Sequence, residues 1–376
     1  MFCRSWGDCW MSKLVFLEDV CDILDSQRVP VTSKNRNKGI YPYYGANGVQ
    51  DYVDDYIFDD ELVLLAEDGG NFGSTEKPIA YRTSGKCWVN NHAHVLKAKE
   101  CIDVDYLCYS LMFYNVSSIV NGATRQKLNQ SMMRKMIIPL PEMNEQHIIV
   151  SKLDKVTNAI KLCNTILEKL DLLVKSQFVE MFGDIRISSI FPNISLDNFA
   201  QIGSSKRVHA ADYVESGIPF YRSKEIIELG NGQEPSVELF ISKKQYECIR
   251  KTNGVPCKGD ILMSAVGTIG KMWIVDGRKD FYYKDGNIIS IHSEETNPIY
   301  LKEALANLID DFKSANVAGS AYSALTIVKL KKMTVPMPPI SLQNEFADFV
   351  QQIDKSKFDV QLLIKNIRRV KFYDQF

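Results

Sequence analysis

The sequence predicts a protein of the α/β (α+β) class, with two similar mixed α/β domains separated by an antiparallel pair of long coiled-coil helices. Three observations predict this architecture. The second half of the chain repeats the first, a heptad pattern follows each copy of the repeat, and each copy contains short apolar runs between polar turns.

Composition and charge limit the class of protein. Of the 376 residues, 45% are hydrophobic and 24% are charged, as in folded proteins with two or three cores. The formal net charge of -1 excludes a global positive field, so any site for a polyanion must be local. No apolar run approaches the roughly 18 residues of a membrane helix, and the start lacks the apolar core of a signal peptide. We therefore expect a cytoplasmic protein with no membrane partner. Nine cysteines without a C-x-x-C pair indicate reduced thiols.

The repeat is clearest where each copy ends. Residues 120–141 align with residues 317–338 without a gap, at an offset of 197, and both segments end in Pro-x-Pro. A second match, of residues 17–29 to residues 196–208, has an offset of 179. The drift from 179 to 197 predicts an insertion of about 18 residues inside the second copy. Each half therefore begins and ends alike and varies in the middle.

The repeat and the heptads set the expected boundaries. We assign no function to the N-terminal extension. The expected segments are the extension 1–12, a first domain 13–141, a central coiled-coil helix 142–184, a second domain 185–338 and a C-terminal coiled-coil helix 339–376.

Short apolar or alternating runs predict the strands of the first domain at residues 15–20, 41–45, 62–68, 78–82 and 135–141. Helical spacing predicts a helix at residues 103–115 and its counterpart at residues 297–313.

Each Pro-x-Pro is followed by apolar residues in alternating steps of four and three, the a and d positions of a coiled coil, which we call the seam. Because an isolated helix would leave this stripe in water, we expect the two seams to bury each other. The first helix would be about 50 Å long and would end at Gly183. In the second helix two lysines, Lys357 and Lys371, stand at seam positions. The seam residues are Ile149, Leu153, Val156, Ile160, Cys163, Leu167, Leu170, Val174 and Met181, followed by Phe346, Val350, Ile353, Val360, Ile364 and Ile367.

Three motifs resemble catalytic or metal-binding signatures, and each has a structural interpretation that we favour. Residues 265–272 lack the first glycine and the final hydroxyl of a phosphate loop. Asn297-Pro-Ile-Tyr300 is similar to the N-P-P-Y of amino-methyltransferases, but it also fits the N-cap of the following helix. His92 and His94 would share one face of a strand with no third ligand near, which favours a satisfied, partly buried pair. The sequence therefore predicts no catalytic residue, no metal site and no cofactor in this chain.

Polar, glycine-rich loops recur at corresponding places in the two halves. Arginine reads guanine, asparagine and glutamine read adenine, and glycines let backbone amides approach phosphates. The alternative is that these loops are ordinary surface turns. The loops cover residues 33–39, 43–49, 68–74 and 121–129, and then residues 203–207, 221–225, 264–271 and 318–325. The candidate DNA-binding residues are Lys34, Arg36, Asn47, Asn71, Ser74, Arg125, Lys127, Lys206, Arg207, Arg222, Lys224, Thr268, Lys271 and Tyr322.

Four segments resemble the specificity (S) subunit of type I restriction-modification systems, and the resemblance covers about residues 13–376. They are LLVKSQFVEMFGD at 172–184, YPYYGANGVQDYV at 41–53, KLNQSMMRKMIIPLPEMNEQHIIVSKLD at 127–154 and QNEFADFVQQIDKSK at 343–357. The resemblance implies two target recognition domains, each binding half of a split sequence in double-stranded DNA, and no catalysis by this chain.

The resemblance also implies partners. Methyltransferase (M) subunits, two in number, would dock on the helices and bring S-adenosylmethionine, and restriction (R) subunits would bring ATP and Mg²⁺ chemistry. Two alternatives remain open at this point. One is a two-domain coiled-coil adaptor that does not bind DNA, and the other is an autonomous adenine methyltransferase.

Overall fold

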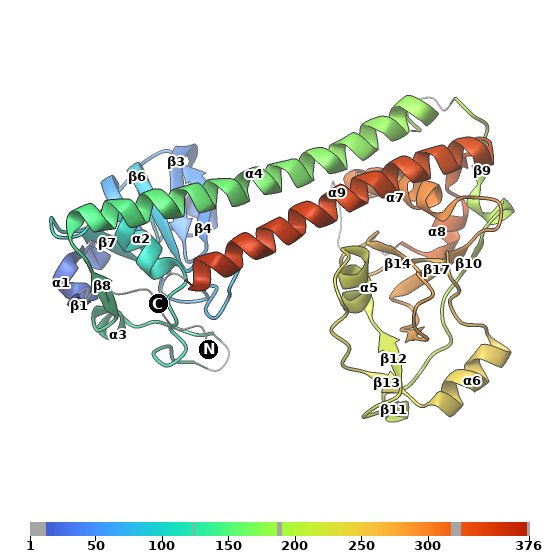
Figure 1. Ribbon diagram of the computed structural model, residues 1–376, viewed down its shortest axis with the longest axis horizontal. Helices are drawn as coiled ribbons and strands as arrows, with labels where there is room; N and C mark the ends of the chain where they lie inside the picture. Colours follow the sequence, from blue (N-terminus) through green and yellow to red (C-terminus); the bar gives the residue numbers. More distant parts are fainter. Residues whose placement is uncertain (1–12, 123–124, 186–189, 317–324, 374–376) are drawn as a thin grey trace, which may run out of the picture. The chain divides into compact units, whose positions relative to one another are not determined.

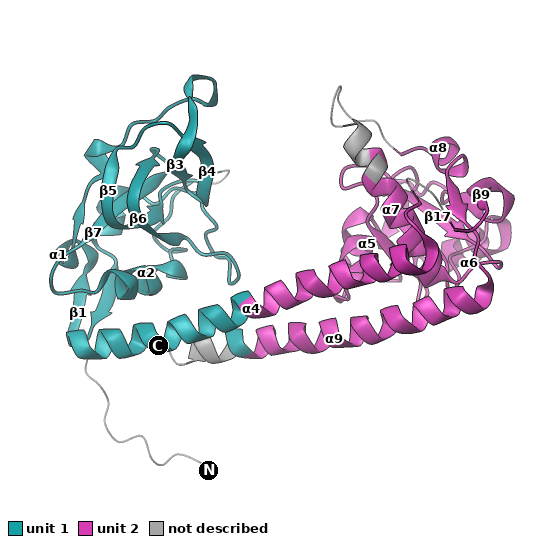
Figure 2. Cartoon of the chain, turned by 90° about the horizontal axis from the view of Figure 1, so that it is seen from above, with its two compact units in different colours: residues 1–161, 367–376 teal, residues 162–366 magenta. Residues whose placement is uncertain are grey.

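The computed structural model describes residues 13–122, 125–185, 190–316 and 325–373. The chain divides into two compact units, residues 1–161 with 367–376 and residues 162–366, which Figure 2 shows in different colours. None of the helices in the described ranges combines the length and the low polarity needed to cross a membrane.

The core of the first unit is a six-stranded mixed sheet in the order β2-β7-β5-β6-β3-β4 (Figure 1). Leu62 to Ala66 of the central strand β5 are fully buried, as expected for a continuous apolar run. The helix α2 (Val104–Met112) packs against β5 and β6, and the Asp103 side chain caps its first turn. The strands are β2 (Cys21–Ile23), β3 (Lys38–Gly45), β4 (Gly48–Val53), β5 (Phe58–Ala66), β6 (Ala80–Val89) and β7 (Ala93–Ala98).

A separate antiparallel pair, β1 (Lys13–Phe16) and β8 (Ile137–Leu140), joins the start and the end of this domain. The predicted strand at residues 15–20 is wrong in its second half, because the strand stops at Phe16 and α1 (Leu17–Val20) follows. Leu17 and Val20 both point into the core, and a spacing of three places them on one face of a helical turn. The remaining short helices are η1 (Asp25–Gln27), η2 (Ser33–Asn35) and α3 (Gln130–Arg134).

The second unit repeats the sheet and the separate strand pair of the first unit, which we call the frame. Its sheet β10-β17-β14-β15 has the neighbour order and antiparallel pairings of β2-β7-β5-β6. The strands β9 (Asn193–Ser195) and β18 (Thr334–Pro336) pair as β1 and β8 do. The predicted helix at 297–313 is α7 (Pro298–Asn316). The other strands of the sheet are β10 (Gln201–Gly203), β14 (Ile261–Ser264), β15 (Met272–Ile274) and β17 (Ile288–His292).

The extra length of the second copy lies between its strands β12 (Ile218–Tyr221) and β14. The equivalent strands of the first unit, β3 and β5, are separated by the single strand β4. In the second unit this connection contains α5 (Ser223–Gly230), β13 (Phe240–Ile241) and α6 (Lys243–Thr252). A second small sheet, β11-β13-β12-β16, supports them. The remaining elements are η3 (Leu196–Asn198), η4 (Ala210–Asp212), β11 (Tyr213–Val214), β16 (Tyr282–Tyr283) and α8 (Ile327–Lys331).

A buried glutamine fixes the start of each long helix in the same way. The Gln146 side chain accepts from the Asp103 amide at 2.7 Å and donates to the Pro141 carbonyl at 2.9 Å. Gln343, at the repeat offset of 197, accepts from the Asn297 amide at 2.8 Å and donates to the Pro338 carbonyl at 2.9 Å. Both glutamines are almost fully buried. The repeat therefore extends to individual hydrogen bonds.

Two long helices, α4 (Met143–Phe182) and α9 (Ile340–Tyr373), carry the seams. Within the second unit they run antiparallel, because Phe178 packs against Phe346 while Asp171, further toward the start of α4, pairs with Lys357. Gly183 ends α4 with a left-handed φ of 82°, as predicted. The mixed α/β class and the antiparallel helices are confirmed.

The burial of the seam follows the heptad. None of the seam residues from Ile149 to Met181, or from Phe346 to Ile367, is exposed, whereas apolar side chains between them, such as Leu162 and Leu172, are more than 60% exposed. Lys357 is half-buried in the seam and its Nζ lies 2.6 Å from the Asp171 carboxylate. Burial lowers the pKa of Lys357, but the Asp171 carboxylate outweighs it, so the net shift is upward. The side chain of Lys371 lies outside the described residues.

Candidate DNA interface

In the first unit, the turn after β5 and the loop that carries Arg125 and Lys127 meet, and Asn47 reaches them from the turn between β3 and β4. The turn after β5 carries Asp68 and Gly69, and Gly69 has a left-handed φ of 61°. The Arg125 guanidinium lies 2.6 Å from the Asp68 carboxylate, and the Asn47 amide donates to the Gly69 carbonyl at 3.0 Å. Arg125 still exposes 60% of its side chain. The ion pair therefore orients the guanidinium and leaves part of it accessible to a ligand.

Lys127 belongs to the same pair of loops. Its Nζ lies 2.9 Å from the Glu67 carboxylate, and its backbone bridges to Asp68 and Asn121. Gly122 turns this loop with a φ of 104°, and a Cβ there would meet the Arg125 carbonyl at 2.4 Å. Only glycine fits this tight return.

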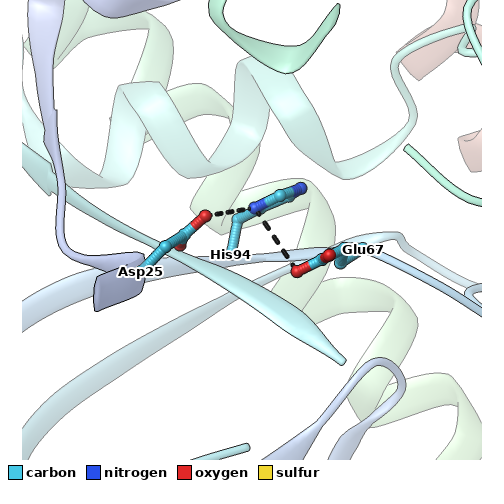
Figure 3. A group of neighbouring side chains, drawn as sticks. All are labelled: Asp25, Glu67 and His94. Atoms are coloured by element: carbon cyan, nitrogen blue, oxygen red, sulfur yellow. Dashed lines mark hydrogen bonds and ion pairs between the residues drawn. The ribbon is translucent and has the colours of Figure 1, made fainter. Parts of the chain in front are cut away.

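Beneath these loops lies a buried charged cluster, made of Asp25, Glu67 and His94 (Figure 3). His94 is fully buried, with Nδ1 2.6 Å from the Asp25 carboxylate and Nε2 2.8 Å from the Leu128 carbonyl. Both ring nitrogens thus face acceptors, and an imidazole donates two hydrogen bonds only when both nitrogens carry protons. The Arg28 guanidinium lies 2.6 Å from the Glu67 carboxylate and adds a further positive charge.

The charges of this cluster lower the pKa values of its acids. Burial raises the pKa of Asp25, but hydrogen bonds and the charge of His94 outweigh it, so the net pKa lies below the ordinary value. Burial likewise raises the pKa of Glu67, and its bonds to Arg28 and Lys127 reverse the shift. The donor atoms of Asp25, Glu67 and His94 lie within 4.8 Å of one another, as metal ligands do, but each already faces a protein partner. We interpret the cluster as an ion-pair network that holds the loop of Leu128.

Both histidines have hydrogen-bond or ion-pair partners, as expected of a satisfied pair, but the expectation that they share a strand face with no third ligand near is wrong. His94 lies in β7 with two carboxylates beside it, whereas His92 precedes the strand and contacts Asp68 at 2.8 Å. The sequence pattern gave no sign of this, because Asp25 and Glu67 lie 69 and 27 residues away in the chain.

The other predicted residues of the first unit have mixed surroundings. Arg36 is largely buried over the Tyr43 ring, 4.0 Å from its centroid, so it supports the fold. The Asn71 amide donates to the Pro78 carbonyl, and the Ser74 hydroxyl accepts from the Lys77 amide, so both stabilise a turn. Lys34 is exposed in η2.

In the second unit most predicted cations are held by carboxylates. Arg207 lies 2.8 Å from Asp285, and this acid raises the arginine's pKa. Arg222 contacts Glu225 and Glu238, at 2.8 and 2.9 Å. The Glu225 hydrogen bond is the main cause that raises the pKa of Arg222. Because the Arg207 side chain is exposed, its pair with Asp285 orients it more than it stabilises the fold, whereas Arg222 is anchored by the buried Glu225.

The remaining predicted residues of this unit are more loosely held. Lys224 contacts Glu238 at 3.0 Å. Lys206 and Lys271 are exposed and have no ion pair within the described ranges. The Thr268 carbonyl accepts from the Ser264 hydroxyl, which closes the turn. Tyr322 lies outside the described residues.

The near-catalytic motifs take structural roles. Residues 265–272 join the antiparallel strands β14 and β15, whereas a phosphate loop leads from a strand into a helix. The Asn297 side chain accepts from the Ile299 amide at 2.9 Å, which confirms it as the cap of α7.

A group of cations on α6 was not predicted from the sequence. Lys243 and Lys244 start this helix, and Arg250 and Lys251 end it. The available signal was their spacing of seven residues, which places both pairs near one side of a helix.

The long helices expose a row of large apolar side chains away from their seams. These residues are between 37% and 62% exposed in this chain, which is unusual for a surface without a partner. They are Ile148, Leu162, Ile166, Leu172, Leu173 and Val179 on α4, and Ile340, Phe358, Leu362 and Leu363 on α9.

Comparison with known proteins agrees with this geometry. A family model, described as the type I restriction modification DNA specificity domain, matches residues 11–172 and 191–366. A protein of Haemophilus influenzae, described as a type I restriction enzyme specificity subunit, is 31% identical over 344 residues, 90% of this chain and 86% of that protein.

Two solved structures share the fold. The type I restriction-modification S subunit from M. genitalium matches with a TM-score of 0.52 and 14% identity, over 98% of this chain and 96% of that one. A chain from a study of type I complex assembly matches with a TM-score of 0.51 and 15% identity, over 95% of both chains. The family model spans both halves and most of the sequence, so the chain belongs to the type I restriction modification DNA specificity family.

Proposed function

We propose that this chain binds a bipartite DNA target and directs type I methyltransferase and restriction subunits to it, without catalysing a reaction itself. The observation that carries the proposal is the repeat. Two domains with the same sheet order and the same glutamine contacts differ in the loops and insertions between equivalent strands. A constant frame with variable loops suits two reading surfaces of different sequence preference.

The polar groups of the first unit support direct contacts to DNA bases. Arg125 is oriented by Asp68 and remains accessible, and a guanidinium held in this way can donate two hydrogen bonds to guanine. Asn47 is held nearby by the Gly69 carbonyl. Restrained donors lose less conformational entropy on binding than free ones.

The exposed apolar row on α4 and α9 supports docking of M subunits. Because each half supplies one copy of the frame, we infer two M subunits per chain. In this proposal S-adenosylmethionine belongs to the M subunits, and ATP and Mg²⁺ belong to the R subunits, so this chain needs no cofactor of its own. An adaptor that does not bind DNA would use the same helices, and the experiments distinguish the two.

The test is a chimera. Residues 30–119, which lie between the constant ends of the first domain, are replaced by the corresponding segment of another family member, and the methylated sites are mapped by methylome sequencing. One half of the methylated target should change and the other half should stay. A chimera that changes both halves contradicts modular reading. DNA binding by the complex of the original chain with M subunits is measured by fluorescence anisotropy over a salt series. If this complex does not bind DNA, the adaptor function is the one that remains.

A further inference from the structure

The second unit has a cationic helix with no counterpart among the described residues of the first unit. In the first unit, β4 and β5 are joined by residues 54–57, which include two aspartates. At the equivalent place in the second unit, residues 242–260 contain α6, with five cations and two carboxylates. One of the carboxylates, Asp260, is buried and bound to His292 at 2.7 Å. The exposed surface of this insertion is therefore strongly positive in a chain whose net charge is -1.

The helix is firmly held by its other face. Tyr246 and Ile249 are buried against Phe220 and Tyr282. The Tyr246 hydroxyl donates to the Asp280 carboxylate at 3.2 Å, and the Ser242 hydroxyl caps the first turn. A rigid helix presents its exposed charges at fixed positions.

Its lysines are free of ion pairs. Lys243, Lys244 and Lys251 are exposed, and none has a carboxylate partner in the part of the chain that the structure describes. This differs from several other predicted DNA-binding cations, since Arg125, Arg207 and Lys224 are each held by an acid. Unpaired ammonium groups bind phosphates without first giving up a partner.

The surface suits a polyanion better than an apolar protein partner. Residues 243–260 contribute no exposed large hydrophobic side chain. The cluster under α6 also contains Val208, at the end of the loop that carries Lys206 and Arg207, and the Lys206 amide donates to the Tyr282 hydroxyl at 2.7 Å. The helix and this predicted DNA-binding loop therefore pack on one small core.

We propose that α6 is a phosphate-binding element of the second recognition domain, in which Lys243, Lys244 and Lys251 contact the DNA backbone beside the half-site that the loops read. This inference rests on the proposed function. It predicts a contribution to affinity that does not depend on base sequence, because phosphates are the same in every sequence. The first domain, in the residues that the structure describes, has no such helix, so the contribution belongs to one side of the target.

The experiment uses the complex of the full chain with its M subunits. The triple variant K243Q/K244Q/K251Q is compared with the original chain on a DNA duplex carrying the methylated target and on a duplex with the second half-site scrambled. If each lysine holds one phosphate, the slope of log affinity against log salt should fall by about 2 to 3. The affinity for both duplexes should fall by the same factor, and the methylated sequence should not change.

Controls separate the possible failures. K332Q removes an exposed lysine at the end of α8 and should leave the slope unchanged. Circular dichroism and copurification with the M subunits check that the triple variant folds. Equal slopes for the original and the triple variant overturn the role of α6. A changed methylated sequence also overturns it, because α6 would then read bases. Failure of the original complex to bind its target would instead overturn the proposed function.

Discussion

At the scale of single residues, charged groups in this protein mostly meet charges of the same chain. Where the pair is exposed, as with Arg125 and Asp68, water screens it and the main result is orientation. Where it is buried, as with His94 and Asp25, removing one partner leaves a charge in a medium of low polarity. The same kind of contact therefore positions a side chain in one place and holds the fold together in another.

We predict that Asp25→Asn destabilises the first domain by about 3 to 5 kcal/mol at neutral pH, because it removes one carboxylate from the buried ion-pair network that includes His94 and Arg28. The pKa of Asp25 is lowered in the folded state, so its contribution is present above the unfolded pKa of roughly 4 and disappears as the pH falls through the folded value. The variant should therefore lose less stability than the original chain on acidification. The measurement is the protection of the Val95 amide, which donates to Asp25 at 2.9 Å, in hydrogen exchange between pH 3 and 7.

Asp22→Asn is the matched control, since Asp22 is exposed on the adjacent strand. Because His94 holds the Leu128 carbonyl, Asp25→Asn should also weaken recognition of the first half-site and not of the second. Unchanged protection of Val95 at pH 7 would contradict the role of this network.

At the scale of elements, the long helices have two apolar faces with different partners. The seam of the second unit is buried by aromatic contacts, with Phe346 about equally close to Phe178 and Phe182, at 5.5 and 5.4 Å between ring centroids. On the other side of α9, Phe358 is 62% exposed. Each helix thus buries its seam within the protein and still exposes apolar side chains on another face.

This difference predicts opposite effects of two substitutions on α9. Phe346→Ala should lower the free energy of unfolding by about 3 to 5 kcal/mol, because it removes a fully buried ring and leaves a cavity. Phe358→Ala should change stability by less than about 0.5 kcal/mol but weaken association with the M subunit. Chemical denaturation and titration calorimetry measure the two quantities. Equal losses of stability would show that Phe358 is not a partner contact.

At the scale of the whole molecule, α4 is one continuous helix that starts in the first unit and ends in the second. The two recognition domains are therefore connected through a helix of fixed length, and α9 has to match that length for the seams to pair. We predict that this length sets the preferred spacing between half-sites.

Inserting one heptad at Leu167 of α4 and one at Val360 of α9 keeps the a and d pattern, because seven residues are one full repeat. Both insertion sites lie on the same side of the Lys357–Asp171 pair, so the two antiparallel helices lengthen together. Seven residues add about 10 Å, and B-DNA advances about 34 Å per ten base pairs. The methylated spacer should lengthen by up to about three base pairs with unchanged half-sites, although DNA bending can absorb part of the change. Inserting four residues shifts the seam and should weaken the pairing instead.

Methylome sequencing of cells that express the lengthened protein measures the spacer. A stable, active variant that methylates only the original spacing would show that the helices tether the domains without measuring the distance.

The sequence by itself determined the repeat, the mixed α/β class and the seams, because these depend on residue spacing along the chain. Gly183 and Asn297 were also predictable, since caps act within a few residues. The strand at residues 15–20 was not, because a three-residue spacing of Leu17 and Val20 inside an apolar run fits a strand and a helical turn alike.

Only the tertiary structure decided which side chains meet across the chain. It brought Asp25, Glu67 and His94 together from three distant segments, and it paired Arg125 with Asp68 across 57 residues. It also left Lys243, Lys244 and Lys251 of α6 without an acid partner among the described residues, whereas Arg125 and Arg207 each have one. The physical reason is that charge pairing and burial depend on distances in space, which folding sets through the packing of the sheets and which no local spacing encodes.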